Sequence, residues 1–110
     1  MDFDNLSEAE KAIVGQALRA AADGPFFPDW EFPTLFGLSR GEFRAIAAAW
    51  PEPLAPAEEV ARAVNDSLNN LLGYPHRKDA VWQQWISVGR PELKGLLRQL
   101  RGSPDFERLV

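Results

Sequence analysis

Proline and glycine interrupt this chain so often that only short regular elements fit between them. Proline lacks a backbone donor and cannot continue a helix, and glycine suits the turn that ends one. Between the interruptions, apolar residues recur every three or four positions, and no alternating run is long enough for a convincing strand. The sequence therefore predicts an all-α fold, a compact bundle of about five short helices. The breaks are Gly24-Pro25, the prolines of 51–56, Gly73, Gly89 and Gly102-Ser103-Pro104.

Two of the helix starts carry a capping box, in which a Ser and a Glu three residues later accept hydrogen bonds from each other's backbone amides. Ser7 with Glu10 is the first, and Ser39 with Glu42 is the second. Residues 1–110 are expected to form a single helical domain whose tail, 103–110, frays or docks. No internal repeat is recognised in the sequence. Helices are expected over 8–23, 40–50, 56–73, 77–87 and 91–101.

Composition narrows the function classes. The chain has 110 residues, enough for one hydrophobic core, and contains no cysteine, which excludes disulfides and thiolate chemistry. Its acidic N-terminus and the lack of a long apolar run predict a cytoplasmic protein with no membrane span. The net charge of −4 is divided unevenly: −5 over 1–37, −2 over 38–75 and +3 over 76–110. Such a balance argues against general nucleic-acid binding.

Residues 25–37, PFFPDWEFPTLFG, combine three prolines with a dense run of aromatic side chains. The prolines forbid a long regular element and the aromatics argue against disorder, so an ordered loop is expected after the first helix. Two interpretations stay open for it: a plug of the core, or a recognition surface. In the second, Trp30 is an exposed anchor between Asp29 and Glu31, and these three residues form the candidate partner-binding site.

Basic residues gather in the last helix. Lys94, Arg98 and Arg101 follow at spacings of four and three, so they share one helix face, with Arg90 preceding them. This stripe is the second candidate contact, suited to an acidic partner, although a charge run is usually a solvated face.

The segment Phe36-Gly37-Leu38-Ser39-Arg40 has the turn and apolar spacing of a helix-turn-helix. Pro33 would lie within its first helix, and Arg40 and Arg44 are the only cations on its second. A degenerate DNA-binding regulator built on residues 33–50 is therefore kept as an alternative.

Catalytic chemistry has little support in the residues. His76 is the only histidine and no acid is tied to it by spacing, so neither a triad nor a zinc site is expected. No phosphate loop, metalloprotease or nucleophile-elbow motif is present, and no cofactor is expected. A ligand-binding or enzymatic cleft near Trp30, Trp82, Trp85 and His76 is the remaining alternative.

The strings FPDWEF, TLFGLSR and LNNLLGYP, spread over residues 26–75, resemble a group of small bacterial proteins with no assigned activity. The resemblance implies a bacterial source and carries no functional residues. Our leading hypothesis is a non-catalytic interaction module, similar to immunity or antitoxin-like inhibitors, that binds another protein. The residues specify neither that partner nor an oligomeric state.

Overall fold

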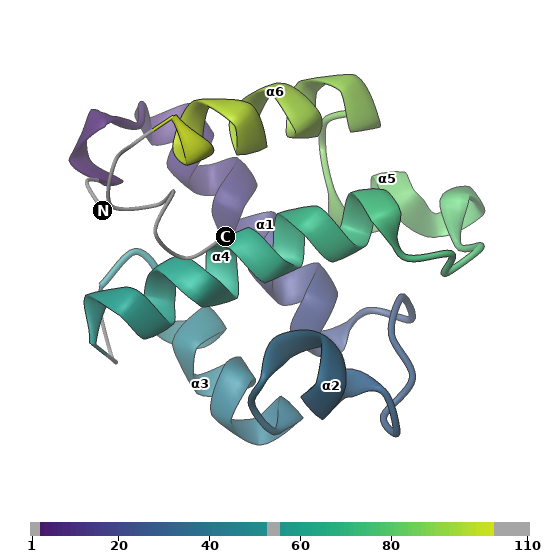
Figure 1. The fold of residues 1–110 in the computed structure, drawn as a ribbon. Helices are drawn as coiled ribbons and strands as arrows, with labels where there is room; N and C mark the ends of the chain where they lie inside the picture. Colours follow the sequence, from purple (N-terminus) through teal and green to yellow (C-terminus); the bar gives the residue numbers. More distant parts are fainter. Residues whose placement is uncertain (1–2, 53–55, 103–110) are drawn as a thin grey trace.

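A computed structural model describes residues 3–52 and 56–102 and confirms the all-α class (Figure 1). The predicted tail, 103–110, lies outside the described residues. No strand occurs among the described residues, and none of their helices is both long enough and apolar enough to cross a membrane. The helices are α1 (Glu8–Asp23), α2 (Phe32–Phe36), α3 (Arg40–Ala49), α4 (Ala57–Gly73), α5 (Trp82–Trp85) and α6 (Arg90–Arg101), with 3-10 turns at Phe3–Asn5 and Asp79–Val81.

Both capping boxes form as predicted. Ser7 Oγ accepts from the Glu10 amide at 3.1 Å, and Glu10 Oε1 accepts from the Ser7 amide at 2.8 Å. Ser39 Oγ accepts from the Glu42 amide at 3.2 Å, with the reciprocal bond at 3.1 Å. These local bonds satisfy amides that a helix start leaves without a partner, which is why α1 and α3 begin where the sequence indicates.

The helix expected over 77–87 is shorter than predicted. The chain makes a 3-10 turn at Asp79–Val81 and only then the brief α5. Ile86 is already extended, and the Trp82 indole Nε1 donates to the Val88 carbonyl at 2.9 Å, so the backbone curls around that ring. The helix therefore ends before its apolar period does, and the Trp82 indole holds the extended backbone that follows.

The structure contradicts the expectation that the chain has no internal repeat. A long helix, a short helix and a medium helix follow one another twice, and the second set lies fifty positions after the first. Helices α1 and α4 end at Asp23 and Gly73, and α3 and α6 begin at Arg40 and Arg90. Each residue in the range 29–48 has the same burial as the residue fifty positions later: both are buried, both are half-buried or both are exposed. The chain thus contains two copies of one three-helix unit.

Few residues are identical between the copies, although the pattern of burial is kept. Phe32 corresponds to Trp82, and Phe43 corresponds to Leu93; all four are buried. The copies therefore preserve apolar positions and not side-chain shapes. Seven equivalent pairs over residues 8–52 are identical: Glu8/Glu58, Val14/Val64, Leu18/Leu68, Pro25/Pro75, Asp29/Asp79, Arg40/Arg90 and Glu42/Glu92.

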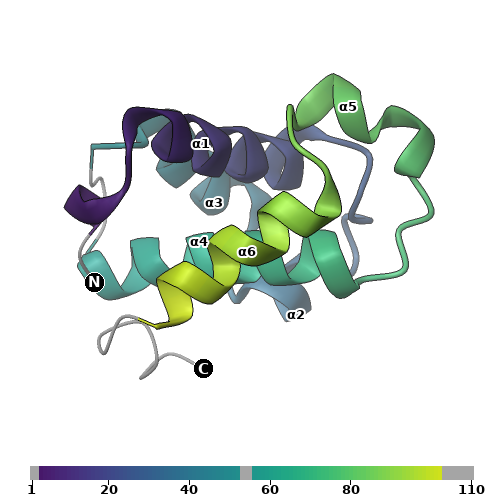
Figure 2. The ribbon, with the colours of Figure 1, turned by 90° about the horizontal axis from the view of Figure 1, so that it is seen from above.

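The two copies pack around each other with approximate two-fold symmetry. Helices α1 and α4 cross at the centre, α3 packs on α1, and α6 packs on α4 (Figures 1 and 2). The short helices are exchanged: α2 contacts α4, and α5 contacts α1. Reciprocal exchange of this kind is what a two-fold axis produces between equivalent elements.

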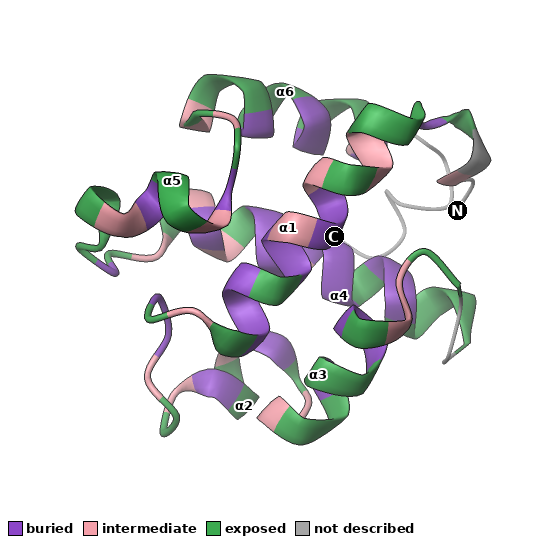
Figure 3. Cartoon of the chain, turned by 180° about the vertical axis from the view of Figure 1, so that it is seen from behind, coloured by how far each residue is buried: buried purple, intermediate pink, exposed green. Residues whose placement is uncertain are grey.

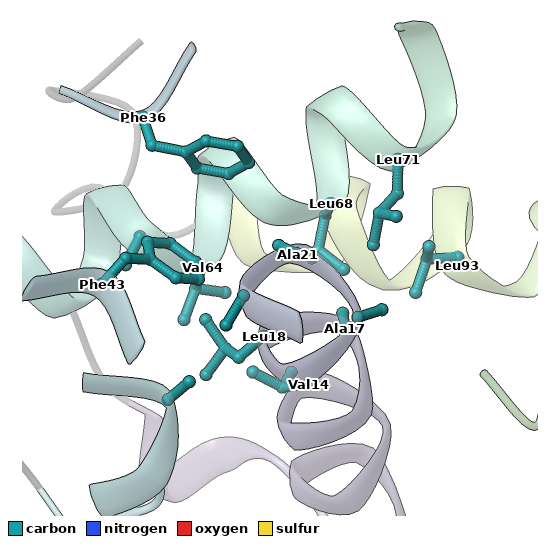
Figure 4. Packing of buried hydrophobic residues seen from close by; sticks show 14 of the residues in the cluster. Val14, Ala17, Leu18, Ala21, Phe36, Phe43, Val64, Leu68, Leu71 and Leu93 are labelled. Carbon is teal, nitrogen blue, oxygen red and sulfur yellow. The ribbon is translucent and has the colours of Figure 1, made fainter. Parts of the chain in front are cut away.

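Equivalent side chains meet at the α1–α4 crossing. Val14 and Leu18 from α1, and Val64 and Leu68 from α4, are all fully buried there (Figure 4). Purple, buried surfaces of the helices turn toward this centre, and green, exposed surfaces turn outward (Figure 3). The interface between the copies is thus the middle of the hydrophobic core, so neither copy has a complete core of its own.

Three of the tryptophans pack against the core to different extents. Trp82 is buried, with 5% of its surface exposed, whereas Trp50 and Trp85 are half-buried against the core. Trp50 lies edge-on to Phe3 at 4.9 Å between ring centroids and donates its indole N–H to the Lys11 carbonyl at 2.8 Å. A Cβ at Gly15 would meet the Trp50 ring at 3.1 Å, which explains a glycine inside α1.

Candidate functional site

The loop between α1 and α2 holds its aromatic residues in two different ways. Phe26 and Phe27 are buried, as is Phe32 at the start of α2. Trp30 is 78% exposed, and it is the one large apolar side chain so exposed among the described residues. The loop therefore plugs the core with its phenylalanines and presents its tryptophan to solvent, combining parts of both interpretations of the sequence.

Both acids beside Trp30 bind other parts of the chain. The Asp29 carboxylate pairs with the Arg40 Nε at 2.9 Å, and Glu31 Oε2 accepts a hydrogen bond from the Tyr74 hydroxyl. This bond to Glu31 is the main cause that raises the pKa of the Tyr74 phenol. One acid thus ties the loop to α3 and the other ties it to the chain after α4, so Trp30 lies on a segment held at both sides.

Arg40 fastens this loop to the end of α1. Its Nη1 donates to the carbonyls of Ala21 and Ala22 at 3.2 and 2.8 Å, and its Nη2 donates to the Phe27 carbonyl at 2.8 Å. Its guanidinium also lies over the Phe32 ring, 4.4 Å from the centroid. A guanidinium suits this position because its fork of donors serves several carbonyls at once, and because a helix C-terminus attracts positive charge.

The second copy repeats this arrangement with Arg90. Its Nη1 donates to the Leu72 carbonyl at 3.1 Å, its Nη2 pairs with Asp79 at 2.6 Å, and its guanidinium lies over Trp82. That ion pair, first through its hydrogen bond, lowers the pKa of the Asp79 carboxyl. Sequence reasoning assigned Arg90 to a binding stripe and missed this role. The signal for it was the repeated Asp-to-Arg spacing of eleven positions.

Trp30 has no counterpart in the second copy, where Ala80 occupies the equivalent position. The anchoring ion pair is present in both copies, so Trp30 is not needed to build the turn. An exposed tryptophan at only one of two equivalent turns is therefore a feature that the fold itself does not require.

The helix-turn-helix hypothesis relied on Arg40 and Arg44, and the structure places both in ion pairs within the chain. Arg44 Nε lies 2.7 Å from the Asp23 carboxylate at the end of α1. Gly37, with φ of 70°, makes the left-handed turn between α2 and α3, while Pro33 lies in the first turn of α2 and not in its middle. The turn is thus helix-turn-helix-like in shape, and its cations are already partnered.

His76 is buried, and both of its ring nitrogens are hydrogen-bonded. Nε2 lies 3.1 Å from the Leu71 carbonyl, which can only accept, and Nδ1 accepts from the Lys78 amide at 2.9 Å. Arg90 Nη2 also lies 3.4 Å from Nε2. The ring packs edge-on to Phe26 and beside Trp82. Both ring nitrogens of this turn histidine are therefore engaged within the chain, so neither is free to act as a general base.

The described residues bring together no three His, Cys, Asp or Glu side chains that could hold a metal ion. The residues of the suggested cleft differ in exposure. His76 and Trp82 pack together, Trp85 is half-buried, and Trp30 points to solvent.

The basic stripe lines a groove between α4 and α6. Arg90, Lys94, Arg98 and Arg101 all border it, so the structure brings these four residues to one surface. Arg101 is held at one end, where its Nε donates to Asn65 Oδ1 at 3.1 Å and its Nη2 donates to Asn69 Oδ1 at 3.0 Å.

Asp66, which is half-buried in α4, is expected to make the stability of the fold depend on pH. Burial is the main influence on its carboxyl and raises its pKa, opposed by a hydrogen bond from Asn65. The folded state therefore holds this proton more tightly than the unfolded state, so the contribution of Asp66 to stability falls as pH rises through the interval between the two pKa values. Asp66→Asn removes this effect. As pH rises from the acid range to neutrality, we expect the thermal midpoint of the variant to rise relative to that of wild type. A difference between the two midpoints that does not change with pH would contradict this prediction.

Comparison of the chain with protein-family models, with curated proteins and with solved structures gives no match. The strings that resemble small bacterial proteins therefore add no residue roles, and the argument for function depends on the geometry above.

Proposed function

We propose that this protein is a non-catalytic binding module, cytoplasmic, that recognises another protein through the turn bearing Asp29, Trp30 and Glu31. The observation that carries the proposal is the 78% exposure of Trp30 on a segment anchored at both sides. Exposed aromatic side chains are the residues that most often dominate binding energy at protein interfaces. A segment that is already ordered loses little further entropy when it docks.

The asymmetry between the copies supports the same proposal. Ala80 shows that a small residue suffices at this turn, so the fold does not require the exposed indole at position 30, which is a residue type enriched at binding hot spots. The alternatives have weaker support. Arg40 and Arg44 are paired internally, which disfavours DNA contact through α3, and the bonded state of His76 disfavours acid–base catalysis.

The Trp30 prediction is tested by capture of partners from the native cell. We expect Trp30→Ala to weaken capture of a stoichiometric partner by about 2 kcal/mol or more, roughly thirtyfold in affinity, while its thermal midpoint stays close to wild type. Capture is quantified by mass spectrometry of proteins that co-purify with the tagged chain, and stability is measured by circular dichroism.

The second copy provides a matched control. The variant Trp30→Ala/Ala80→Trp moves the indole to the equivalent turn and keeps the composition constant. If capture is due to this particular surface, the swapped protein should fail to bind, whereas recovery of capture by the swap would indicate nonspecific adhesion to an exposed indole. A partner retained by both variants would overturn the proposal.

A further inference from the structure

All the charged side chains that line the groove between α4 and α6 are positive. The groove has a volume of about 660 Å³ and is bordered by four cationic side chains and no acidic one. Lys94 and Arg98, four positions apart on α6, are exposed on its rim. Among the described residues, neither of these two cations forms an ion pair.

In the first copy the equivalent cation is paired within the chain. Lys94 corresponds to Arg44, and Gly73, at the end of α4, corresponds to Asp23 at the end of α1. In the first copy the Asp23 carboxylate lies 2.7 Å from Arg44 and joins the two helices. In the second copy glycine replaces that acid, so the cation is kept and its carboxylate is missing.

Further replacements make the second groove more apolar and more positively charged than the first. Leu72 and Leu97 take the places of Ala22 and Ala47, which enlarges the apolar surface between the helices. Arg98 takes the place of Ala48, which adds a charge to the rim. The second groove therefore offers aliphatic surface below two cations that form no ion pair with another described residue.

We propose that the α4–α6 groove binds an acidic peptide segment of a partner protein. One carboxylate of the peptide lies at Lys94, where the first copy has its own Asp23, and a second lies at Arg98. An apolar side chain of the peptide rests on Leu72 and Leu97. The apolar floor favours a peptide over a nucleic acid, because a phosphate backbone supplies cation partners but no aliphatic side chain to cover leucines.

This groove is independent of the Trp30 turn. In Figure 1, α6 and the segment from α1 to α2 lie on different sides of α4. The test below leaves Trp30 unchanged and uses defined peptides, so its failure would not affect the proposal made for that turn.

Gly73→Asp is the decisive variant, because it restores the acid that the first copy has. A Cβ at Gly73 meets no atom within 4 Å, so a side chain can start there without displacing a neighbour. We expect the new carboxylate to pair with Lys94 and to compete with the peptide. Gly73→Asn is the matched control, with nearly the same shape and no charge.

The probe is a fluorescent amphipathic peptide of Leu, Glu and Ala as long as α6, twelve residues. A version with Lys in place of Glu and a single-stranded DNA of similar length serve as comparisons. By fluorescence anisotropy we expect the acidic peptide to bind, the basic one not to bind, and the DNA to bind more weakly. Gly73→Asp should weaken the acidic peptide about tenfold or more, and Gly73→Asn should change it little.

A second variant, Lys94→Glu/Arg98→Glu, covers the case in which Gly73→Asp folds poorly. Both side chains are exposed, so this variant should keep the wild-type thermal midpoint and lose the acidic peptide. Equal affinity for both peptides, unchanged affinity in Gly73→Asp or in the charge-reversed variant, or DNA binding as tight as peptide binding would overturn the proposal.

Discussion

Replacing Trp82 by Ala is expected to lower the free energy of unfolding by about 3–5 kcal/mol, the usual range for truncating a large buried aromatic residue. Trp82 is 5% exposed, and its ring packs against Phe26 and His76. Its indole also holds the backbone after α5 through the Val88 carbonyl. The loss therefore combines a cavity in the core with a carbonyl left without its donor.

Two variants separate these contributions, with urea denaturation as the measurement. Trp82→Phe introduces the residue found at the equivalent position, Phe32, so it removes the hydrogen bond while keeping most of the apolar volume. We expect it to cost about 1–2 kcal/mol. Trp30→Ala makes the same chemical change at the exposed tryptophan and should cost less than about 0.5 kcal/mol. Similar losses in Trp82→Ala and Trp30→Ala would refute the assignment of Trp82 to the core.

Helix positions could be predicted because the signals that set them are local. The Ser7 and Ser39 caps act within four residues, and the Gly24-Pro25 break needs no distant partner. The chain leaves α5 at Ile86, where there is no Gly or Pro, and the Trp82 indole holds the extended backbone at Val88. For that reason the helical period alone predicted too long a helix over 77–87.

The internal repeat was not found because most equivalent residues differ in identity. Phe36 faces the core where the second copy has Ile86, and the capping Ser39 is replaced by Gly89. The copies share the order in which buried and exposed positions follow one another. Comparing residue identities one by one does not show this order. The combination of Asp, an Arg eleven positions later and a Glu two beyond it was the available signal, at 29–42 and again at 79–92.

The roles of the basic residues also depend on distant partners. The sequence placed Arg90 in one stripe with Lys94 and Arg98. Arg90 is bonded to the end of α4, whereas the other two are exposed on the rim of the groove. Charge and spacing predict which face a cation lies on. They do not predict whether a carboxylate or a helix end from another element meets it there, because that is decided by how the helices pack.

The hydrogen bonds from Arg40 to the end of α1 and to the following loop are expected to contribute strongly to stability. Arg40→Ala is expected to lower the free energy of unfolding by about 2–4 kcal/mol, since three part-buried carbonyls lose a charged donor. Arg40→Lys should recover only a minor part, because a single ammonium cannot reach the Ala21, Ala22 and Phe27 carbonyls together. Urea denaturation of both variants measures the difference.

The matched variant is Asp29→Ala, which removes the ion pair and leaves the carbonyl contacts. The Asp29 side chain is 93% exposed, so its loss should cost less than about 1 kcal/mol. Arg90→Ala should fall between the two, because its side chain is 40% exposed where that of Arg40 is 20% exposed, and its bonds to the helix end are longer. If Asp29→Ala were as destabilising as Arg40→Ala, the ion pair and not the helix-end carbonyls would hold the loop. The Trp30 turn would then depend on salt concentration, since an exposed ion pair is screened by salt and bonds to part-buried carbonyls are much less so.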